Sequence, residues 1–330
     1  MWSRKFKSER ARTLGVRKVP LFISIVVTLA LLYVLLRQAS VTQIVSAFGS
    51  ISIWTVALGF ALYLLVQLFR SLRSWFLLQG KVPVSELFSI TCVHNAMVNA
   101  LPARTGELSY VYLLKKSGQS VGTGVGTLAL ARIFDLLAMG ILFALAAVLV
   151  SDLPDFVLQA RLPALIFVAV VVLLLLLMVV FSTQTVLVLN AVVKLLGLKG
   201  NKVATWVLAK AEETLHSLHV VKSWKPVVGA LSCSIGVWLL LFTVNFLIFS
   251  GIGVTQSFVL VVLASSVSSL LSSLPIQGIA GFGTTEAFWT IALIGIGIAP
   301  EVAVVAGFTQ HLIALLYIFL LGVYGFWTRP

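Results

Sequence analysis

The chain has 330 residues, of which 60% are hydrophobic and 10% charged, and its formal net charge is +13. Soluble domains carry roughly 25% charged residues, so this composition excludes an ordinary soluble fold. The basic excess does not indicate nucleic-acid binding, because Lys and Arg concentrate in the cytoplasmic loops of membrane proteins and meet anionic lipids there.

Six apolar runs are long enough to cross the hydrocarbon core as helices, which takes about 20 residues. They cover residues 19–37, 52–70, 122–150, 163–182, 227–250 and 302–326. Such continuous runs exclude a membrane β-barrel, whose strands alternate apolar and polar residues. We therefore predict an all-α, polytopic helical membrane protein. The first run is predicted to be a retained span, because it is long for a signal peptide and no small-residue cleavage site follows it.

Two further apolar regions are interrupted by the helix breakers proline and glycine. The breakers are Pro102 and Gly106 in residues 85–117, and Pro275, Gly278, Gly281 and Gly283 in residues 256–298. Each region is predicted to form two short helices that meet at an elbow.

The basic residues indicate how these regions lie in the membrane. If both are re-entrant hairpins, the tail 1–18, the loop after the second span with Arg70 and Arg73, the segment 183–226 and the C-terminus all lie in the cytoplasm. A full crossing at only one elbow would place many basic residues outside, against the positive-inside rule. We therefore predict two re-entrant hairpins and cytoplasmic termini.

This topology contains a repeat within a single transmembrane domain that covers residues 1–330. Residues 52–150 and 227–326 each hold a span, an elbow and a second span, and the two hairpins would enter from opposite sides. Inverted repeats with broken helices are typical of secondary transporters, whose substrate site lies near the midplane where the breaks meet. The alternative is a chance likeness between two helical segments, because the two sequences barely align.

The segment 183–226 between the two units is not a span. Its partial apolar stripe predicts a cytoplasmic amphipathic helix at 185–221, lying on an anionic leaflet. His216 and His219 lie near two glutamates there, but they do not make a complete metal-ligand set. We predict no metal and no other cofactor.

Ionisable side chains inside the bilayer are the candidates for chemistry. They are Arg104, Glu107, Arg132, Asp135 and Glu286. Each such charge costs about 2.5–3.5 kcal/mol on insertion scales, so each needs a role. Arg132 and Asp135 are three residues apart on a helix and could pair as a structural clamp. Arg104 could bind a lipid phosphate, which suits its planar fork, or pair with Glu107.

The elbow sequences resemble those of a known family. Residues 99–107 read Asn-Ala-Leu-Pro-Ala-Arg-Thr-Gly-Glu, residues 274–286 read Leu-Pro-Ile-Gln-Gly-Ile-Ala-Gly-Phe-Gly-Thr-Thr-Glu, and Arg132 and Asp135 form an R-x-x-D step. These features resemble the membrane region of the lysylphosphatidylglycerol synthase/flippase family over nearly all of residues 20–326. Ala131 and Gln277 depart from its pattern, where Glu and Gly are usual.

The resemblance implies lipid translocation. Because the printed sequence ends at Pro330, we expect a stand-alone member that lacks the soluble synthase domain and so does not synthesise the lipid. A prokaryotic cytoplasmic membrane is the expected location. The expected partners are membrane lipids with an anionic headgroup, and a separate lipid synthase or glycosyltransferase.

The leading hypothesis is a flippase or transporter for a phosphate-bearing lipid: a phospholipid, an aminoacyl-phosphatidylglycerol or a polyprenyl-phosphate-linked lipid. To the five ionisable residues we add Asn99 and Thr284 as substrate-binding candidates. Pro102, Gly106, Pro275, Gly281 and Gly283 are the candidate structural elbow residues.

Two alternatives remain open. One is an intramembrane lipid-modifying enzyme with Glu107, His94 or His311 as its acid or base. The other is an accessory subunit of a lipid-modifying or glycosyltransferase complex that acts through residues 185–221. The serine-rich stretch Ser265–Ser273 is interpreted as close helix packing rather than a substrate-lining face.

Overall fold

A computed structural model describes residues 24–149, 166, 213–214, 220, 223–274 and 277–328, without the side chains of residues 102–104. The described part consists of helices and the short turns and loops that join them, and it contains no strand. The tail 1–18 and Pro275 lie outside the described residues. So do nearly all of the predicted span 163–182 and the predicted amphipathic helix 185–221.

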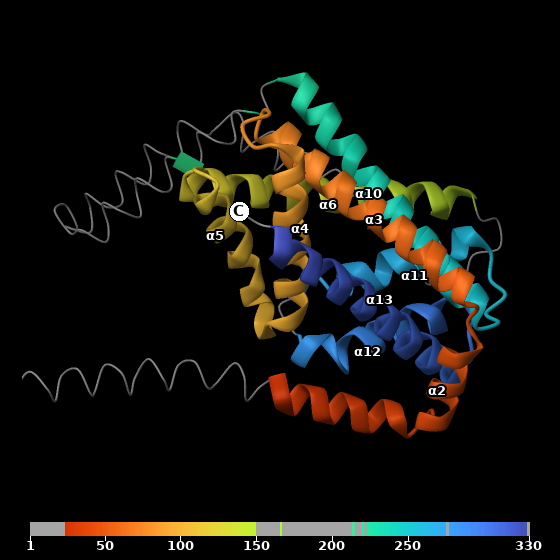
Figure 1. The fold of residues 1–330 in the computed structure, drawn as a ribbon. Coiled ribbons are helices and arrows are strands. Elements are labelled where there is room, and N and C mark those ends of the chain that lie inside the picture. The colour runs from red at the N-terminus through yellow and green to blue at the C-terminus, as the bar shows by residue number, and fades with distance from the viewer. Residues whose placement is uncertain are drawn as a thin grey trace, which may run out of the picture.

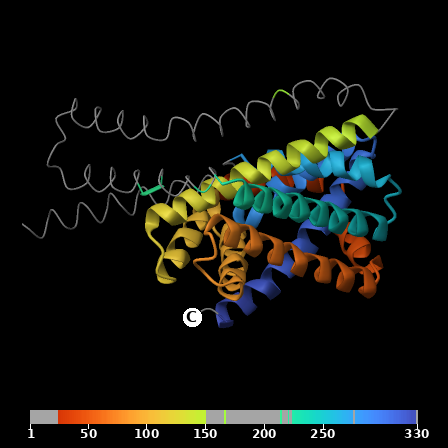
Figure 2. The same ribbon diagram turned by 90° about the horizontal axis from the view of Figure 1, so that it is seen from above.

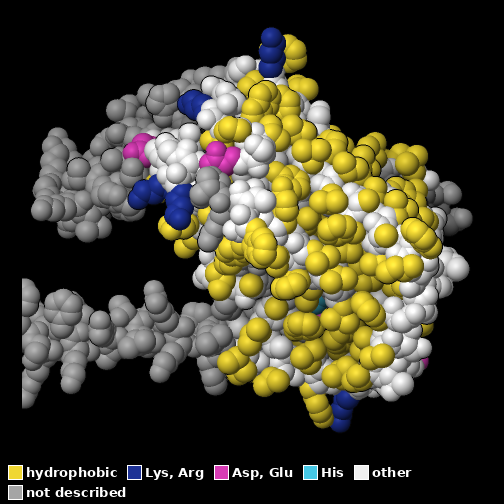
Figure 3. All heavy atoms as spheres, viewed as in Figure 1, with side chains coloured by type: hydrophobic (Ala, Val, Ile, Leu, Met, Phe, Trp, Pro, Cys, Tyr) yellow, Lys and Arg dark blue, Asp and Glu magenta, His cyan; other side chains and the backbone are white. Residues whose placement is uncertain are grey.

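Four long apolar helices form the body of the bundle. They are α3 (Ile53–Leu77), α6 (Val121–Leu149), α10 (Trp224–Gly251) and α13 (Pro300–Thr328), and each is long and apolar enough to cross a membrane (Figure 1). Apolar side chains cover most of the face seen in Figure 3, as a lipid environment requires. These helices confirm four of the six predicted spans and a polytopic helical membrane protein.

The end of α3 corrects one prediction. Arg70 and Arg73 were assigned to a cytoplasmic loop, but α3 continues to Leu77 and contains both residues. Arg73 is only 6% exposed and is bonded to Asp135 of α6. An arginine can lie inside the bundle because such a partner offsets its charge, and a hydropathy window does not register partners.

Helices α3 and α10 pack side by side along their length and run antiparallel (Figures 1 and 2). Gly229 at the start of α10 lies against Phe76, whereas Gly251 at its end lies against Ile51, just before α3. Since these are the first long helices of the two predicted units, their directions are opposite.

The first broken region is a hairpin. It consists of α4 (Val84–Ala100), the 3-10 turn η1 (Pro102–Glu107) and α5 (Leu108–Lys116). Near the turn, a Cβ added at Gly106 would lie 2.1 Å from the Met97 carbonyl oxygen, so only glycine fits. One turn further on, Ser109 lies 3.2 Å from His94. Helix α5 therefore returns along α4, as the elbow prediction requires.

The second broken region has the same order of elements. It consists of α11 (Phe258–Leu271), the 3-10 turn η3 (Ile279–Gly281) and α12 (Thr284–Gly295). Gly281 and Gly283 have φ angles of +80° and +82°, which glycine adopts at little cost. Helices α11 and α12 pack on each other, and η3 contacts η1, so the two elbows meet.

Each hairpin packs on the last long helix of the other unit. Helix α4 contacts α13, and α11 contacts α6. Within each unit, α5 packs on α6 and α12 packs on α13. Each hairpin therefore contacts long helices of both units and lies in the interior of the bundle.

The predicted first span forms a helix over Ser24–Leu36, followed by a helix that was not predicted, α2 (Val41–Ser50), at an angle of 83°. A capping box between Ser40 and Gln43 starts α2. The Thr28 hydroxyl accepts a hydrogen bond of 2.9 Å from the backbone N–H of Ile279. The first helix is therefore tied to the second elbow.

Candidate functional site

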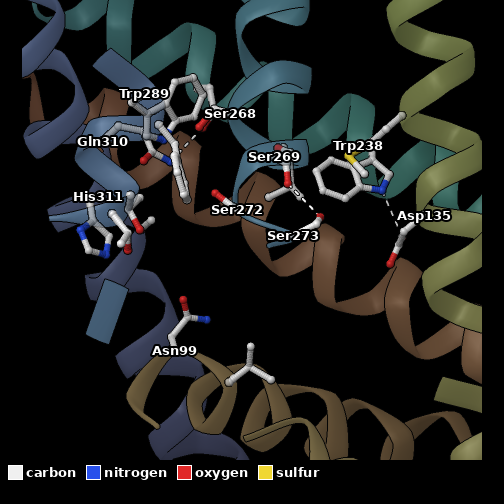
Figure 4. Close-up of a pocket in the computed structure, with 18 of the residues that line it drawn as sticks. Asn99, Asp135, Trp238, Ser268, Ser269, Ser272, Ser273, Trp289, Gln310 and His311 are labelled. Carbon is white, nitrogen blue, oxygen red and sulfur yellow. Dashed lines mark hydrogen bonds between the residues drawn. The ribbon is translucent and has the colours of Figure 1, made fainter. Parts of the chain in front are cut away.

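A cavity of about 500 Å³ lies where the two elbows meet. Its walls come from α4, η1, α6, α10, α11, α12 and α13, with the second elbow between α11 and α12. Figure 4 shows Asp135 and Trp238 at one side of this space and Gln310 and His311 at the other, with the serines of α11 between them.

The structure brings five of the seven predicted substrate-binding residues to this cavity. They are Asn99, Glu107, Arg132, Asp135 and Thr284. Glu286 lies behind His311, which lines the cavity. The side chain of Arg104 is outside the described part of the chain, so its expected phosphate-binding role stays a prediction.

The charged side of the cavity is a network between α3, η1, α6 and α10. Arg132 donates to Glu107 at 3.1 Å and lies 3.9 Å from Asp135. Asp135 also accepts from Arg73 and, at 3.0 Å, from the indole N–H of Trp238. The predicted pairing of Arg132 with Asp135 is therefore the longest contact in the network, and each residue has a closer partner on another element.

A second pocket of about 120 Å³ adjoins this network and shares Val98, Arg132 and Asp135 with the cavity. Arg70 and Arg73 line it. Arg70 donates to the Asn95 side chain at 3.2 Å and forms no ion pair within the described residues. Around the joined pockets, the described arginines Arg70, Arg73 and Arg132 outnumber the carboxylates Glu107 and Asp135. The site thus carries a positive excess suited to an anion.

The opposite side of the cavity holds a buried pair. Glu286 is fully buried, and its Oε1 lies 2.7 Å from Nδ1 of His311. Its second oxygen is buried without a hydrogen-bond partner among the described residues. His311 also packs on the ring of Phe282 in the second elbow. The sequence singled out Glu286 but did not pair it with His311, because the two residues lie on different helices.

Thr284 has a local role as well as a place in the cavity wall. Its hydroxyl donates to the Gly281 carbonyl at 3.0 Å and accepts from the Gly278 N–H at 3.2 Å. These two bonds satisfy backbone groups that the broken helix leaves without partners, as buried backbone requires.

Uncharged polar side chains line the middle of the cavity. Four are serines at the C-terminal end of α11 (the α11 serines): Ser268 and Ser269 lie in its last turn, and Ser272 and Ser273 directly follow it. Gln310 of α13 donates to Asn245 of α10 at 3.1 Å, and Asn245 donates to Ser265. We interpreted the serine-rich stretch as helix packing. In the structure, four of its serines also line the cavity.

Comparison with known protein families shows which proteins share this sequence pattern. The family model for the lysylphosphatidylglycerol synthase TM region matches residues 21–322, nearly the whole chain. The chain belongs to this family. As a member of the lysylphosphatidylglycerol synthase TM region family, it is an integral membrane protein related to proteins of lipid synthesis and flipping. Neither the search of curated proteins nor the search of solved structures gave a match.

The sequence features that suggested this family lie around one space in the fold. The first elbow supplies Asn99 and Glu107, the R-x-x-D step supplies Arg132 and Asp135, and the second elbow supplies Thr284. The motif residues that are shared with the family are thus far apart in the chain but form the wall of one cavity.

Proposed function

We propose that this protein moves a phosphate-bearing lipid between the two leaflets of its membrane. The observation that carries the proposal is the positive excess beside the cavity, and above all Arg70, which forms no salt bridge among the described residues and interacts at longer range with Asp135, a carboxylate that Arg73 already holds. A guanidinium stays charged inside a membrane and needs an anion. A lipid phosphate would supply one negative charge and accept two parallel hydrogen bonds.

The size of the cavity supports a headgroup as its occupant. Its volume of about 500 Å³ falls in the usual range of small-molecule sites, about 300–1,000 Å³. A whole lipid with two acyl chains is larger than this. The headgroup would therefore cross inside the protein while the acyl chains stay in the surrounding bilayer.

An inverted repeat would supply the movement. Three features support it: the antiparallel packing of α3 on α10, the same helix–elbow–helix order in both hairpins, and the reciprocal packing of α4 on α13 and α11 on α6. In such architectures one repeat rocks against the other, and the central site opens to each side in turn. Here that centre is the cavity between the elbows.

A transport assay in vesicles tests the proposal. The purified protein is reconstituted with phosphatidylglycerol labelled on an acyl chain, and exposure of the label at the outer leaflet is followed by chemical quenching. Wild-type protein should accelerate exchange over protein-free vesicles. Arg70→Gln should slow it at least about tenfold, the loss expected for a charge-assisted hydrogen bond.

The matched control is Arg37→Gln. Arg37 lies over the Tyr33 ring and lines neither the cavity nor the arginine-lined pocket, so its loss should leave the rate unchanged. If wild-type protein accelerated none of a panel of phospholipids and polyprenyl-phosphate sugars, the transport proposal would be wrong.

The topology has its own test. Lys115 and Lys116 end α5 and Lys225 begins α10, and these helix ends lie at one end of the bundle, whereas α2 and the start of α13 lie at the other (Figure 1). Single cysteines at Lys81 and Lys116 should react only from the cytoplasmic side, and a cysteine at Glu301 only from outside. Opposite labelling of positions 81 and 116 would exclude a re-entrant first hairpin.

A further inference from the structure

We propose that the headgroup beyond the phosphate is uncharged and rich in hydroxyls, such as a polyol or a sugar. This inference rests on the proposed function and narrows its substrate class. It concerns the part of the cavity that lies away from the arginines, between the α11 serines, α12 and α13.

Hydrogen-bonding groups without charge dominate this part of the wall. The α11 serines contribute hydroxyls, and Asn99, Asn245 and Gln310 contribute amides from three other helices. Hydroxyls and amides can both donate and accept. A polyol presents the same mixture of donors and acceptors, so the two surfaces match in chemistry.

Two side-chain amide oxygens here lack partners among the described residues. The side-chain oxygens of Gln277 and Gln310 are buried and accept no hydrogen bond from the described residues. Both residues line the cavity, Gln277 from the second elbow and Gln310 from α13. A buried polar atom without a partner is unfavourable, and a hydroxyl of the headgroup would satisfy each of them.

Aromatic rings complete the wall. Trp289 and Phe288 come from α12. Trp289 is 4% exposed and is held edge-on by Phe249 at a centroid distance of 5.0 Å. Rigid aromatic faces suit the C–H faces of a sugar ring, while the surrounding amides and hydroxyls take its hydroxyls.

The charges argue against a cationic headgroup. Among the described lining residues the carboxylates are Glu107 and Asp135, and each is ion-paired with an arginine. Glu286 is fully buried behind His311 and bonded to it. A buried ammonium needs a carboxylate partner, and here it would instead approach a positive excess.

A panel of lipids separates these classes. Acyl-labelled phosphatidylinositol and phosphatidylglycerol carry hydroxyls, phosphatidylmethanol has the phosphate alone, and lysylphosphatidylglycerol adds amines. In reconstituted vesicles, the two hydroxyl-bearing lipids should exchange at least about tenfold faster than the other two, as expected of a site built to bond hydroxyls.

Two variants test the residues. Gln310→Leu and, independently, Gln277→Leu should each lower the ratio of phosphatidylinositol to phosphatidylmethanol exchange several-fold. Gln119→Leu is the control, since Gln119 lies in the loop before α6 and away from the cavity, and it should keep the wild-type ratio. Reading a ratio makes the result independent of how much protein folds.

The outcomes are distinct. If no lipid moves faster than in protein-free vesicles, the proposed function itself fails. If lysylphosphatidylglycerol or phosphatidylmethanol exchanges as fast as phosphatidylinositol, transport stands but the hydroxyl-rich headgroup is excluded. Unchanged ratios in both glutamine variants would remove these residues from the site.

Discussion

The two elbows share an order of elements but differ in chemistry. The first elbow meets a charged network in which Glu107 and Asp135 are held by arginines from α3 and α6. The second elbow faces hydroxyls and amides, and its carboxylate, Glu286, is withdrawn behind His311. Both elbows close one cavity, so each contributes a different kind of wall.

This difference suggests that two hairpins with the same order of elements contribute to different parts of substrate binding. The side with arginines can hold a charge that is common to all phospholipids, whereas the neutral side can distinguish what is attached to that charge. Substitutions on the two sides should therefore differ in their effects on stability and on selectivity.

The largest effect is expected at the charged side. Arg73→Leu removes the closest partner of Asp135, and both side chains are nearly buried. Removal of one partner of a buried ion pair destabilises a protein by about 3–5 kcal/mol, and Asp135 would keep only the Trp238 indole and the 3.9 Å contact with Arg132. Thermal unfolding of the purified variant in detergent should show a large drop in Tm.

The double variant Arg73→Leu/Asp135→Leu should recover much of this loss, because no charge is then left without a partner. If Arg73→Leu alone unfolded at the wild-type temperature, the charged network would not hold the first elbow.

A smaller effect is expected at the neutral side. Gln310→Leu removes the hydrogen bond to the Asn245 side-chain oxygen, and loss of one partner of a buried neutral polar group costs about 1–3 kcal/mol. The same unfolding measurement should rank Gln310→Leu below Arg73→Leu. Equal costs would mean that the two sides do not differ in the way that their contacts indicate.

The smallest effect concerns the backbone of the second elbow. Ala280 has a φ of +50° between glycines that also have positive φ or close contacts. A non-glycine residue in the left-handed region costs roughly 1–2 kcal/mol of stability. Glycine removes this cost, but it also raises the conformational entropy of the unfolded chain, which offsets part of the gain. Ala280→Gly should therefore stabilise the protein by under about 1 kcal/mol.

The matched substitution is Gly283→Ala, which should destabilise the protein. Gly283 has a φ of +82°, and an added Cβ would lie 2.9 Å from that of Leu31. A Tm that fell in Ala280→Gly would show that the elbow is not strained at this position.

The hairpins could be predicted from the sequence because their signals are local. Proline and glycine interrupt apolar runs at Pro102 and Gly283 and thereby mark the turns, and intramembrane charges such as Asp135 mark the site. Helix α2 was missed because its capping box, Ser40 with Gln43, follows directly on a longer apolar run.

The missed site residues required tertiary knowledge. Arg70 and Arg73 lie at the edge of an apolar window, where a loop is the simpler interpretation, and their partners come from α4, α6 and α10, which are distant in the sequence. Gln310 and Ser269 look like ordinary polar residues of a helix until the fold places both in the wall of one cavity.

The hydrogen bond between Thr28 and the backbone of Ile279 has a consequence for biosynthesis. It joins residues 251 positions apart, and the Tyr317 hydroxyl bonds the Val56 carbonyl over a similar separation. During synthesis the first helices must therefore wait in the bilayer until the last third of the chain has been inserted. Contacts of such long range form slowly, so the assembly of the second elbow should set the pace at which a newly made chain becomes compact.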